Sequence, residues 1–247
     1  MNDTHDPAHA FVRCAAQALA LQGPVYRLRA RTTAESFEIS GLHEVFLDKT
    51  YIEYPQPLDD GIDEQPQPLA IADGSARTVI CLDALAYVFH LREMVDELVR
   101  VLAPGGVLLV SAPLDSPLGG FADDYWRLTP ACLMRLLEPL SLRVIGALGR
   151  EDYPHLVLGM GIKGPVSPEA QRGVSSFVRQ YENWLEATAA TNWMSEAGDW
   201  IRRVILRREV RHSRRYAGRF VIDLPAPDES WYMTPVVGKL GGSRLDC

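Results

Sequence analysis

The chain has 247 residues, 47% of them hydrophobic and 23% charged, a composition typical of a soluble globular protein with one core and at most an appended segment. The net charge of -7 argues against a general affinity for nucleic acid. No apolar run approaches the roughly 20 residues that a membrane-spanning helix needs, so we expect no membrane association.

Cysteine usage and the N-terminus indicate a cytoplasmic protein. The cysteines form no CxxC pair, and Cys81 and Cys132 lie in core-like patterns, which favours reduced thiols over a disulfide framework or a zinc site. The opening residues, MNDTHDPAHAF, lack the basic and apolar regions of a secretory signal. No two candidate ligands stand at metal spacing, so we expect no metal site.

Helices and strands alternate in the first third of the chain. Apolar spacing and Gly-Pro breaks predict helices at Ala8–Leu21 and Phe37–Phe46, and strands at Val25–Ala30, Thr50–Tyr54 and Leu69–Ala72. A loop rich in Pro and Asp, residues 55–68, precedes the last of these strands.

The stretch from Arg77 to Arg127 predicts a βαβ unit. Thr78–Cys81 is a β-branched run of the kind that a buried parallel strand needs. A helix follows, with an apolar stripe from Leu91 to Leu102, and Pro104-Gly105-Gly106 ends it. Val107–Ser111 is the next buried strand, and the crossover between the two strands is right-handed.

The remaining elements are a helix, two strands and a segment of different character. We expect a helix at Pro130–Leu137 and strands at Leu142–Leu148 and His155–Ile162. From Ser167 onward the chain predicts helices at Val174–Ala187 and Glu196–Arg211, followed by a tail rich in Pro and Gly, Val221–Cys247.

The segment RTVICLDALAYVFHLREMVDELVRVLAPGGVLLVSAP resembles the second half of class I S-adenosylmethionine (SAM)-dependent methyltransferases of the type 11 kind. In that family a strand of the form FDxVxxxxxLEHV is followed by a helix and then by LKPGGxLxxSxP. The resemblance extends from Gly23 to Gly164. It implies an α/β fold with a Rossmann-like, doubly wound, seven-stranded sheet in residues 1–165, its last two strands forming an antiparallel hairpin at one edge. Residues 166–247 would form a helical and irregular C-terminal extension packed on or beside this domain.

The motif that binds the cofactor in this family is degenerate here. Where the family has ExGxGxG, Arg27 takes the place of the acid and Arg29 that of the first glycine. The Arg29 side chain would occupy the space of the ligand or move the loop away, and its cation would repel a sulfonium but attract a carboxylate or phosphate. Glu53 is the acid nearest to the family's ribose-binding position at the end of the second strand.

Other positions that match ligand contacts of the family lie around the predicted fourth strand, Thr78–Cys81. Asp73 matches the acid of the PFPDxSFD loop near the adenine, and the LEHV element has become Leu85-Ala86-Tyr87-Val88. Asp83, just past the strand, is placed to touch a ligand or to cap the turn. The resemblance therefore implies cofactor contacts by Arg29, Glu53, Asp73 and Asp83, with SAM as the cofactor.

The loop GGFADDYWRLTP resembles the GxxxDYWRxTP segment of one branch of these methyltransferases and follows a strand at the carboxyl edge of the sheet. Asp124 is a candidate general base or substrate anchor, Tyr125 and Trp126 are candidate pocket walls, and Arg127 is a candidate anion clamp. In the alternative interpretation Asp124 and Arg127 pair, the aromatics lock the loop, and Thr129 caps the next helix.

Two histidines are further candidates. His155 opens a predicted strand near this loop and is either a catalytic residue or a structural histidine. His90 follows the fourth strand and either caps the helix or contacts the substrate.

A segment rich in arginine lies near the C-terminus, residues 200–219, with Glu209 as its one acid. It could bind an anionic substrate, an acidic partner or RNA, or it could be a solvated amphipathic helix whose arginines pair with the acidic surface of its own chain. Because the whole chain is acidic, we favour the solvated helix or self-association over nucleic-acid binding. We expect any homo- or hetero-oligomer to form through this segment.

Two functions follow from the resemblance. The first is a biosynthetic methyltransferase that acts on a small molecule with SAM in an atypical pocket. The second is a methyltransferase-fold protein that has lost SAM binding and is a partner or regulatory subunit, or catalyses a non-methylation reaction.

Overall fold

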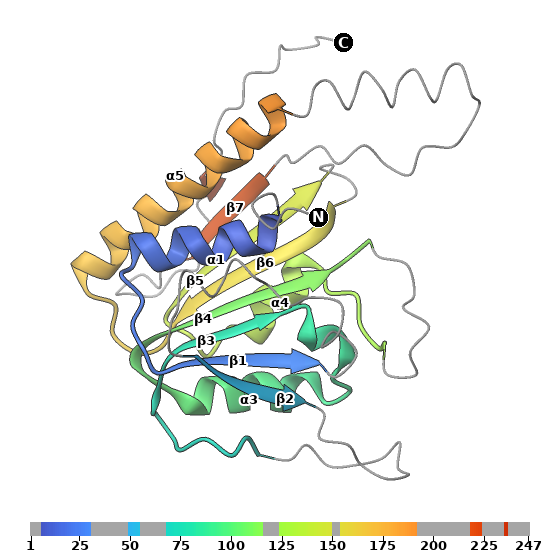
Figure 1. Cartoon of the computed structure of the whole chain (residues 1–247), viewed down its shortest axis with the longest axis vertical. Helices are drawn as coiled ribbons and strands as arrows, with labels where there is room; N and C mark the ends of the chain where they lie inside the picture. Colours follow the sequence, from blue (N-terminus) through green and yellow to red (C-terminus); the bar gives the residue numbers. More distant parts are fainter. Residues whose placement is uncertain are drawn as a thin grey trace.

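The computed structural model describes residues 6–30, 49–54, 68–115, 124–149, 154–191, 218–223 and 235–236, and their side chains within 6–28, 68–115, 124–149 and 154–188. Its helices are α1 (Pro7–Ala18), the 3-10 helix η3 (Ala84–Tyr87), α3 (Leu91–Val101), α4 (Pro130–Leu136) and α5 (Pro168–Thr191). Its strands are β1 (Val25–Ala30), β2 (Lys49–Tyr54), β3 (Ala76–Leu82), β4 (Leu102–Pro113), β5 (Leu142–Gly149), β6 (Pro154–Ile162), β7 (Gly218–Asp223) and β8 (Pro235–Val236) (Figure 1).

The described strands form one mixed sheet in the order β2-β1-β3-β4-β6-β5-β7-β8. β2, β1, β3 and β4 run parallel to one another, whereas the pairs β4–β6, β6–β5, β5–β7 and β7–β8 are antiparallel. In Figure 1 the arrows of β1, β3 and β4 point to the same side, so the carboxyl ends of these strands share one edge of the sheet. The α/β class and the βαβ unit are therefore confirmed.

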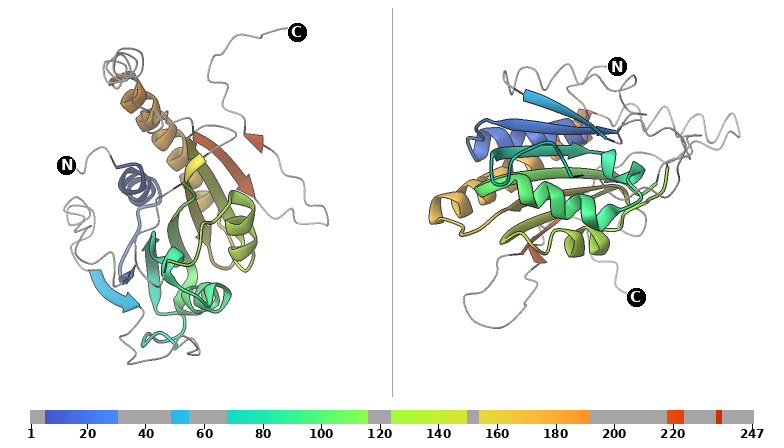
Figure 2. Two further views of the ribbon diagram at one scale, coloured as in Figure 1. Left: turned by 90° about the vertical axis from the view of Figure 1, so that its right-hand side faces the viewer. Right: turned by 90° about the horizontal axis from the view of Figure 1, so that it is seen from below.

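Helices cover both faces of the sheet, as the doubly wound prediction requires (Figure 2). On one face α1 packs against α5, where the Phe11 ring meets those of Phe177 and Tyr181 edge to face at centroid distances of 5.0 and 5.3 Å. The Tyr181 hydroxyl also donates a hydrogen bond to the carbonyl of Pro7 (2.9 Å). This contact ties the start of α1 to a residue of α5 that lies 174 positions later in the chain.

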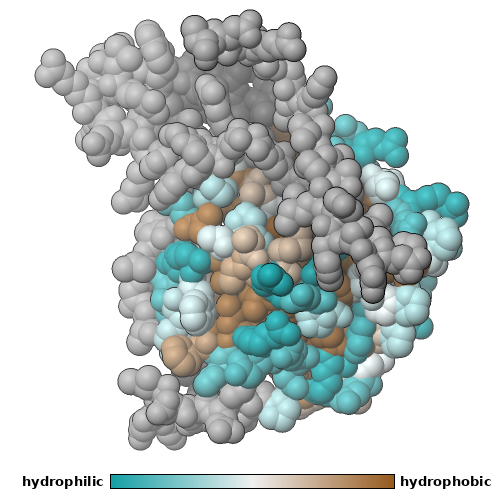
Figure 3. Space-filling model, turned by 180° about the vertical axis from the view of Figure 1, so that it is seen from behind, coloured by the Kyte–Doolittle hydropathy of each residue, from teal (hydrophilic) through white to brown (hydrophobic). Residues whose placement is uncertain are grey.

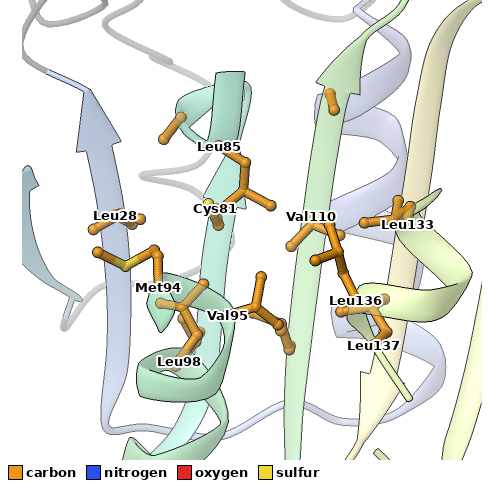
Figure 4. Packing of buried hydrophobic residues seen from close by; sticks show 14 of the residues in the cluster. Leu28, Cys81, Leu85, Met94, Val95, Leu98, Val110, Leu133, Leu136 and Leu137 are labelled. Atoms are coloured by element: carbon orange, nitrogen blue, oxygen red, sulfur yellow. The ribbon is translucent and has the colours of Figure 1, made fainter. Parts of the chain in front are cut away.

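The other face is covered by α3 and α4. Met94, Val95 and Leu98 of α3 and Leu133 of α4 point toward the sheet residues Leu28, Cys81 and Val110 (Figure 4). The α3 residues recur at helical spacing, as the sequence predicted. Seen from behind, the surface has apolar residues near its centre with hydrophilic residues around them (Figure 3).

The crossover helix ends before the Pro-Gly-Gly sequence that was predicted to end it. α3 stops at Val101 and β4 begins at the next residue, Leu102, so Gly105 and Gly106 lie within β4, which starts five residues before the predicted strand Val107–Ser111. Gly105 has a φ of +77°, which glycine adopts without strain. A Cβ atom at Gly106 would lie 2.8 Å from the carbonyl oxygen of Ala103, so no larger residue fits there.

One predicted strand is absent. Leu69–Ala72 forms neither helix nor strand, because α3 side chains take its backbone hydrogen bonds. The amide of Leu69 donates to the carboxylate of Glu97 (3.0 Å), and the carbonyls of Leu69 and Ile71 accept from the guanidinium of Arg100 (3.1 and 3.0 Å). A segment that is hydrogen-bonded to a helix in this way leaves no ladder for a sheet neighbour.

The predicted hairpin exists but not at the sheet edge. β5 and β6 are antiparallel, yet β6 lies between β4 and β5, and β7 pairs with the outer side of β5. Strands β7 and β8 come from residues after 165, so the sheet has eight described strands rather than seven. The predicted helix Val174–Ala187 lies within the longer α5. The division of the chain at residue 165 stays a prediction.

Several predicted segments lie outside the described residues. These are the helices Phe37–Phe46 and Glu196–Arg211, and residues 200–217 of the segment rich in arginine. Its last residues, Gly218 and Arg219, belong to β7. Oligomerisation through this segment stays a prediction.

Candidate functional site

Asp83 and Ser111 join the carboxyl ends of β3 and β4. The amide of Asp83 donates to both the carbonyl and the Oγ atom of Ser111 at 3.0 Å, and that hydroxyl donates to Oδ1 of Asp83 at 2.7 Å. Asp83 adopts the left-handed conformation (φ 57°), which Asp tolerates better than most residues. The turn after β3 therefore places a carboxylate at the sheet edge where open α/β folds bind ligands.

The carboxyl group of Asp83 has an unusual electrostatic environment. Burial raises its pKa, the hydrogen bond from Ser111 lowers it, Asp6 raises it and Arg27 lowers it. Asp6 is the N-cap of α1, where its side chain accepts hydrogen bonds from the amides of Ala8 and His9. Charged groups from the start of α1 and from β1 thus act on the end of β3.

Arg27 is buried in β1, with only 6% of its surface exposed. It lies two residues after Val25, so both share the face of the strand that α1 covers. Because Arg27 lowers the pKa of Asp83, the two charges partly compensate one another. The cation of Arg27 therefore acts on Asp83 through its charge.

The two predicted cofactor contacts on β1 and β2 lie side by side in backbone register. Arg29 of β1 pairs with Glu53 of β2, close to the carboxyl ends of both strands. Their side chains lie outside the described part of the structure, so both residues stay predictions.

Asp73 lies near the amino end of β3, opposite the carboxyl end that Asp83 follows. It lies three residues before β3, its side chain is 81% exposed, and it forms an ion pair with Arg100 near the end of α3. Arg100 also holds Glu97 through two hydrogen bonds (2.9 and 2.8 Å). The structure therefore does not bring Asp73 together with Asp83, and Asp73 has a structural contact instead.

The loop with the DYWR sequence docks on the segment that follows β3. The amides of Tyr125 and Trp126 donate to the carbonyl of Ala86 (2.9 and 3.0 Å), and Nε1 of Trp126 donates to the carbonyl of Val88 (2.8 Å). At its end, the Thr129 side chain accepts from the amide of Cys132 and caps α4, as predicted. The loop is therefore held at the same edge as Asp83.

Asp124 and Arg127 pair with each other inside this loop. Their two hydrogen bonds measure 2.5 and 2.9 Å, and the Asp124 side chain is only 4% exposed. The hydrogen bonds that Arg127 donates to Asp124 raise the pKa of Arg127, with a smaller contribution from Tyr87. The alternative interpretation of the sequence predicted this pairing of Asp124 with Arg127.

Three aromatic side chains form what we call the aromatic ledge, Phe89, Tyr125 and Trp126. The Phe89 ring lies 5.3 Å from Tyr125 at an interplanar angle of 69°, and 6.5 Å from Trp126 at 32°. All three rings are exposed, by 54, 41 and 37%. Phe89 is not among the candidates that the sequence indicated, because the rings beside it belong to a segment more than 30 residues later in the chain.

The two candidate histidines also lie near this edge. His90 packs edge to face on Phe89 (5.3 Å), and its Nδ1 atom is 3.9 Å from the Glu93 carboxylate. His155 is half-buried at the start of β6, and its carbonyl accepts from the amides of Leu114 and Asp115 just past β4 (3.0 and 3.2 Å). Both lie close to strand ends that carry other site residues.

In the part of the chain that the structure describes, no three His, Cys, Asp or Glu side chains are grouped so that they could hold a metal ion. None of the described helices is long and apolar enough to cross a membrane.

Comparison with known proteins gives structural similarities alone. No protein-family model matches the chain, and no curated protein matches it. Solved structures that match it include a SAM-dependent methyltransferase from Thermotoga maritima (14% identity, TM-score 0.39, covering 63% of this chain and 91% of that one). Others are the N-methyltransferase NodS from Bradyrhizobium japonicum (12%, 0.39, 64% and 94%) and a SAM-dependent methyltransferase from Aquifex aeolicus (13%, 0.38, 64% and 94%). Similarities of this size assign neither an activity nor a ligand to this chain.

Proposed function

We propose that this protein binds SAM in an atypical pocket at the carboxyl edge of β1, β2 and β3, and transfers its methyl group to a small molecule. The observation that carries the proposal is the position of Asp83. It lies at the end of β3, fixed by Ser111, while the loop with the aromatic ledge docks a few residues further on. A cofactor contact and a substrate contact would then share one sheet edge.

The charges of the site are compatible with a sulfonium ligand. A lone buried cation at Arg27 would disfavour one. Because Asp83 and Asp6 act on the same region, the positive charge is opposed by carboxylates. Asp83, with Arg29 and Glu53 on the neighbouring strands, would hold the cofactor's polar groups.

Bound SAM would supply an electrophilic methyl group, so the protein has mainly to position the acceptor. Tyr125 and Trp126 would contact the acceptor, and His90 or His155 would take its proton where it carries one. Asp124 and Arg127 would act through the loop that they hold, because each already neutralises the other.

A second function is favoured by one observation. Arg27 is buried where the family resemblance calls for an acid, while Asp83 is hydrogen-bonded to Ser111 and its pKa is lowered by the charge of Arg27. A protein with this arrangement could retain the fold without SAM and act as a partner or regulatory subunit, or catalyse a non-methylation reaction.

Calorimetric titration with SAM and with S-adenosylhomocysteine separates the two functions. The first predicts binding of both at about micromolar strength, and a loss of about tenfold in Asp83→Asn. Asp73→Asn, at the opposite edge, is the matched control and should bind as the parent does. Absence of heat and of thermal stabilisation at millimolar ligand would overturn the first function and leave the second.

A further inference from the structure

The aromatic ledge is where the exposed apolar surface of the described residues is concentrated. Among the described residues, the large hydrophobic side chains that are exposed are those of the ledge, Phe89, Tyr125 and Trp126. They come from two segments far apart in the sequence, which the hydrogen bonds to Ala86 and Val88 bring together. Exposed apolar side chains that gather in this way mark a binding surface more often than scattered ones do.

The ledge is held in place before any ligand arrives. The Trp126 indole is fixed by the hydrogen bond from its N–H to the Val88 carbonyl, and the residue is still partly exposed. The backbone on either side of it is anchored to Ala86 and, through the Asp124–Arg127 pair, to itself. A ligand that stacks here therefore orders few side chains, which favours affinity.

The charges around the ledge argue against an anionic ligand. The guanidinium of Arg127 is engaged by Asp124 on two sides, and the carboxylate of Glu93 lies beside His90. The ledge thus presents ring faces beside an already neutralised arginine. Such faces suit the flat surface of another aromatic ring.

We propose that the ledge binds a planar aromatic group with no negative charge, and that the methyl acceptor is a molecule of this class. The assignment of the acceptor rests on the proposed function, whereas binding to the ledge does not. The chain between Asp83 and Val88 is a single short turn with η3, so an aromatic acceptor on the ledge would lie near the proposed cofactor edge.

Binding to the ledge is tested without SAM, by saturation-transfer NMR titration of the full chain with three probes of similar size. The probes are 2-naphthol, which is flat and neutral, decahydro-2-naphthol, which is not flat, and 2-naphthoate, which is anionic. We expect 2-naphthol to bind about tenfold more tightly than its saturated analogue and at least as tightly as 2-naphthoate.

Variants locate the binding. Phe89→Ser and Trp126→Ala should each weaken 2-naphthol binding by about tenfold, whereas Tyr125→Phe, which keeps its ring, should not change it. Trp184→Phe is the matched control, because Trp184 stacks on Tyr181 on the other face of the molecule. Circular dichroism confirms folding, and Phe89→Ser, at the most exposed ring, keeps the test valid if Trp126→Ala unfolds.

Three results would overturn the inference. They are equal binding of the flat and the saturated probe, unchanged binding in Phe89→Ser, and tighter binding of 2-naphthoate that Arg127→Met abolishes. Binding of 2-naphthol in a protein that shows no heat with SAM would keep the ledge and reject the methyltransferase proposal. SAM binding without binding of 2-naphthol would do the reverse.

Discussion

The carboxylate of Asp124 and the guanidinium of Arg127 form a two-point ion pair three residues apart, and the carboxylate is almost fully buried. Residues of these types in a loop at the edge of an α/β sheet suggest a general base and an anion clamp. Because each engages the other, their observed contacts fix the loop backbone and so the direction of the neighbouring rings.

Arg127→Met should destabilise the fold, because it leaves the Asp124 carboxylate buried without its cation. We expect a loss of about 3 kcal/mol in the free energy of unfolding, measured by urea denaturation at pH 7. Arg92→Met is the control, since it removes an ion pair with Asp96 in which both side chains are half exposed, and should cost less than about 0.5 kcal/mol. Equal losses in the two variants would show that the Asp124–Arg127 pair is only a surface contact.

The elements that could be predicted from the sequence are those whose signal is local. The α3 stripe, the glycines after it and the β-branched run of β3 lie within about 30 consecutive residues, and the structure has them within two residues of the predicted bounds at most helix and strand ends. Thr129 as a cap of α4 was also readable, because a capping side chain bonds to an amide three residues away.

Features that depend on contacts between distant segments could not be predicted. Leu69–Ala72 has the composition of a short strand, but Glu97 and Arg100, which occupy its backbone groups, lie about 30 residues away. The place of Phe89 beside Tyr125 also depends on the loop 124–129, which lies more than 30 residues later in the chain. The influence of Asp6 and Arg27 on Asp83 likewise arises only when α1 and β1 pack at the end of β3.

Asp83→Asn should change the pH dependence of stability. Burial raises the pKa of Asp83 in the folded state, so its stabilising contribution is complete below the unfolded pKa of about 3.9 and is lost as pH rises through the folded pKa. Asn cannot ionise, accepts the Ser111 hydrogen bond and tolerates the left-handed conformation. The variant should therefore gain stability relative to the parent as pH rises from 3 to 7, measured by urea unfolding at each pH. A difference that does not vary with pH would contradict this.

Arg100→Lys should lower stability by about 1–2 kcal/mol, because a single ammonium cannot replace a guanidinium that holds Glu97, Asp73 and the carbonyls of Leu69 and Ile71. Thermal unfolding followed by circular dichroism measures the loss. Arg135→Lys, at a side chain that is 81% exposed, should leave the midpoint nearly unchanged. If both variants melt with the parent, the contacts of Arg100 contribute little, and the segment before β3 is held by other means.

Gly161→Ala should show how tightly the segment after α4 packs on the centre of the sheet. A Cβ atom at Gly161 of β6 would lie 2.1 Å from Cδ1 of Leu140, a residue that is itself buried. The substitution should cost about 1–3 kcal/mol in urea unfolding, as overpacked cores do. A Leu140→Ala background removes the Cδ1 atom and leaves the Cβ of residue 140 at 3.1 Å, so the same substitution should cost less than about 0.5 kcal/mol, and the double-mutant cycle should give a coupling energy of at least about 0.5 kcal/mol. Additive losses would mean that β6 moves to accept the methyl group, because a rigid central strand would keep the clash with Leu140.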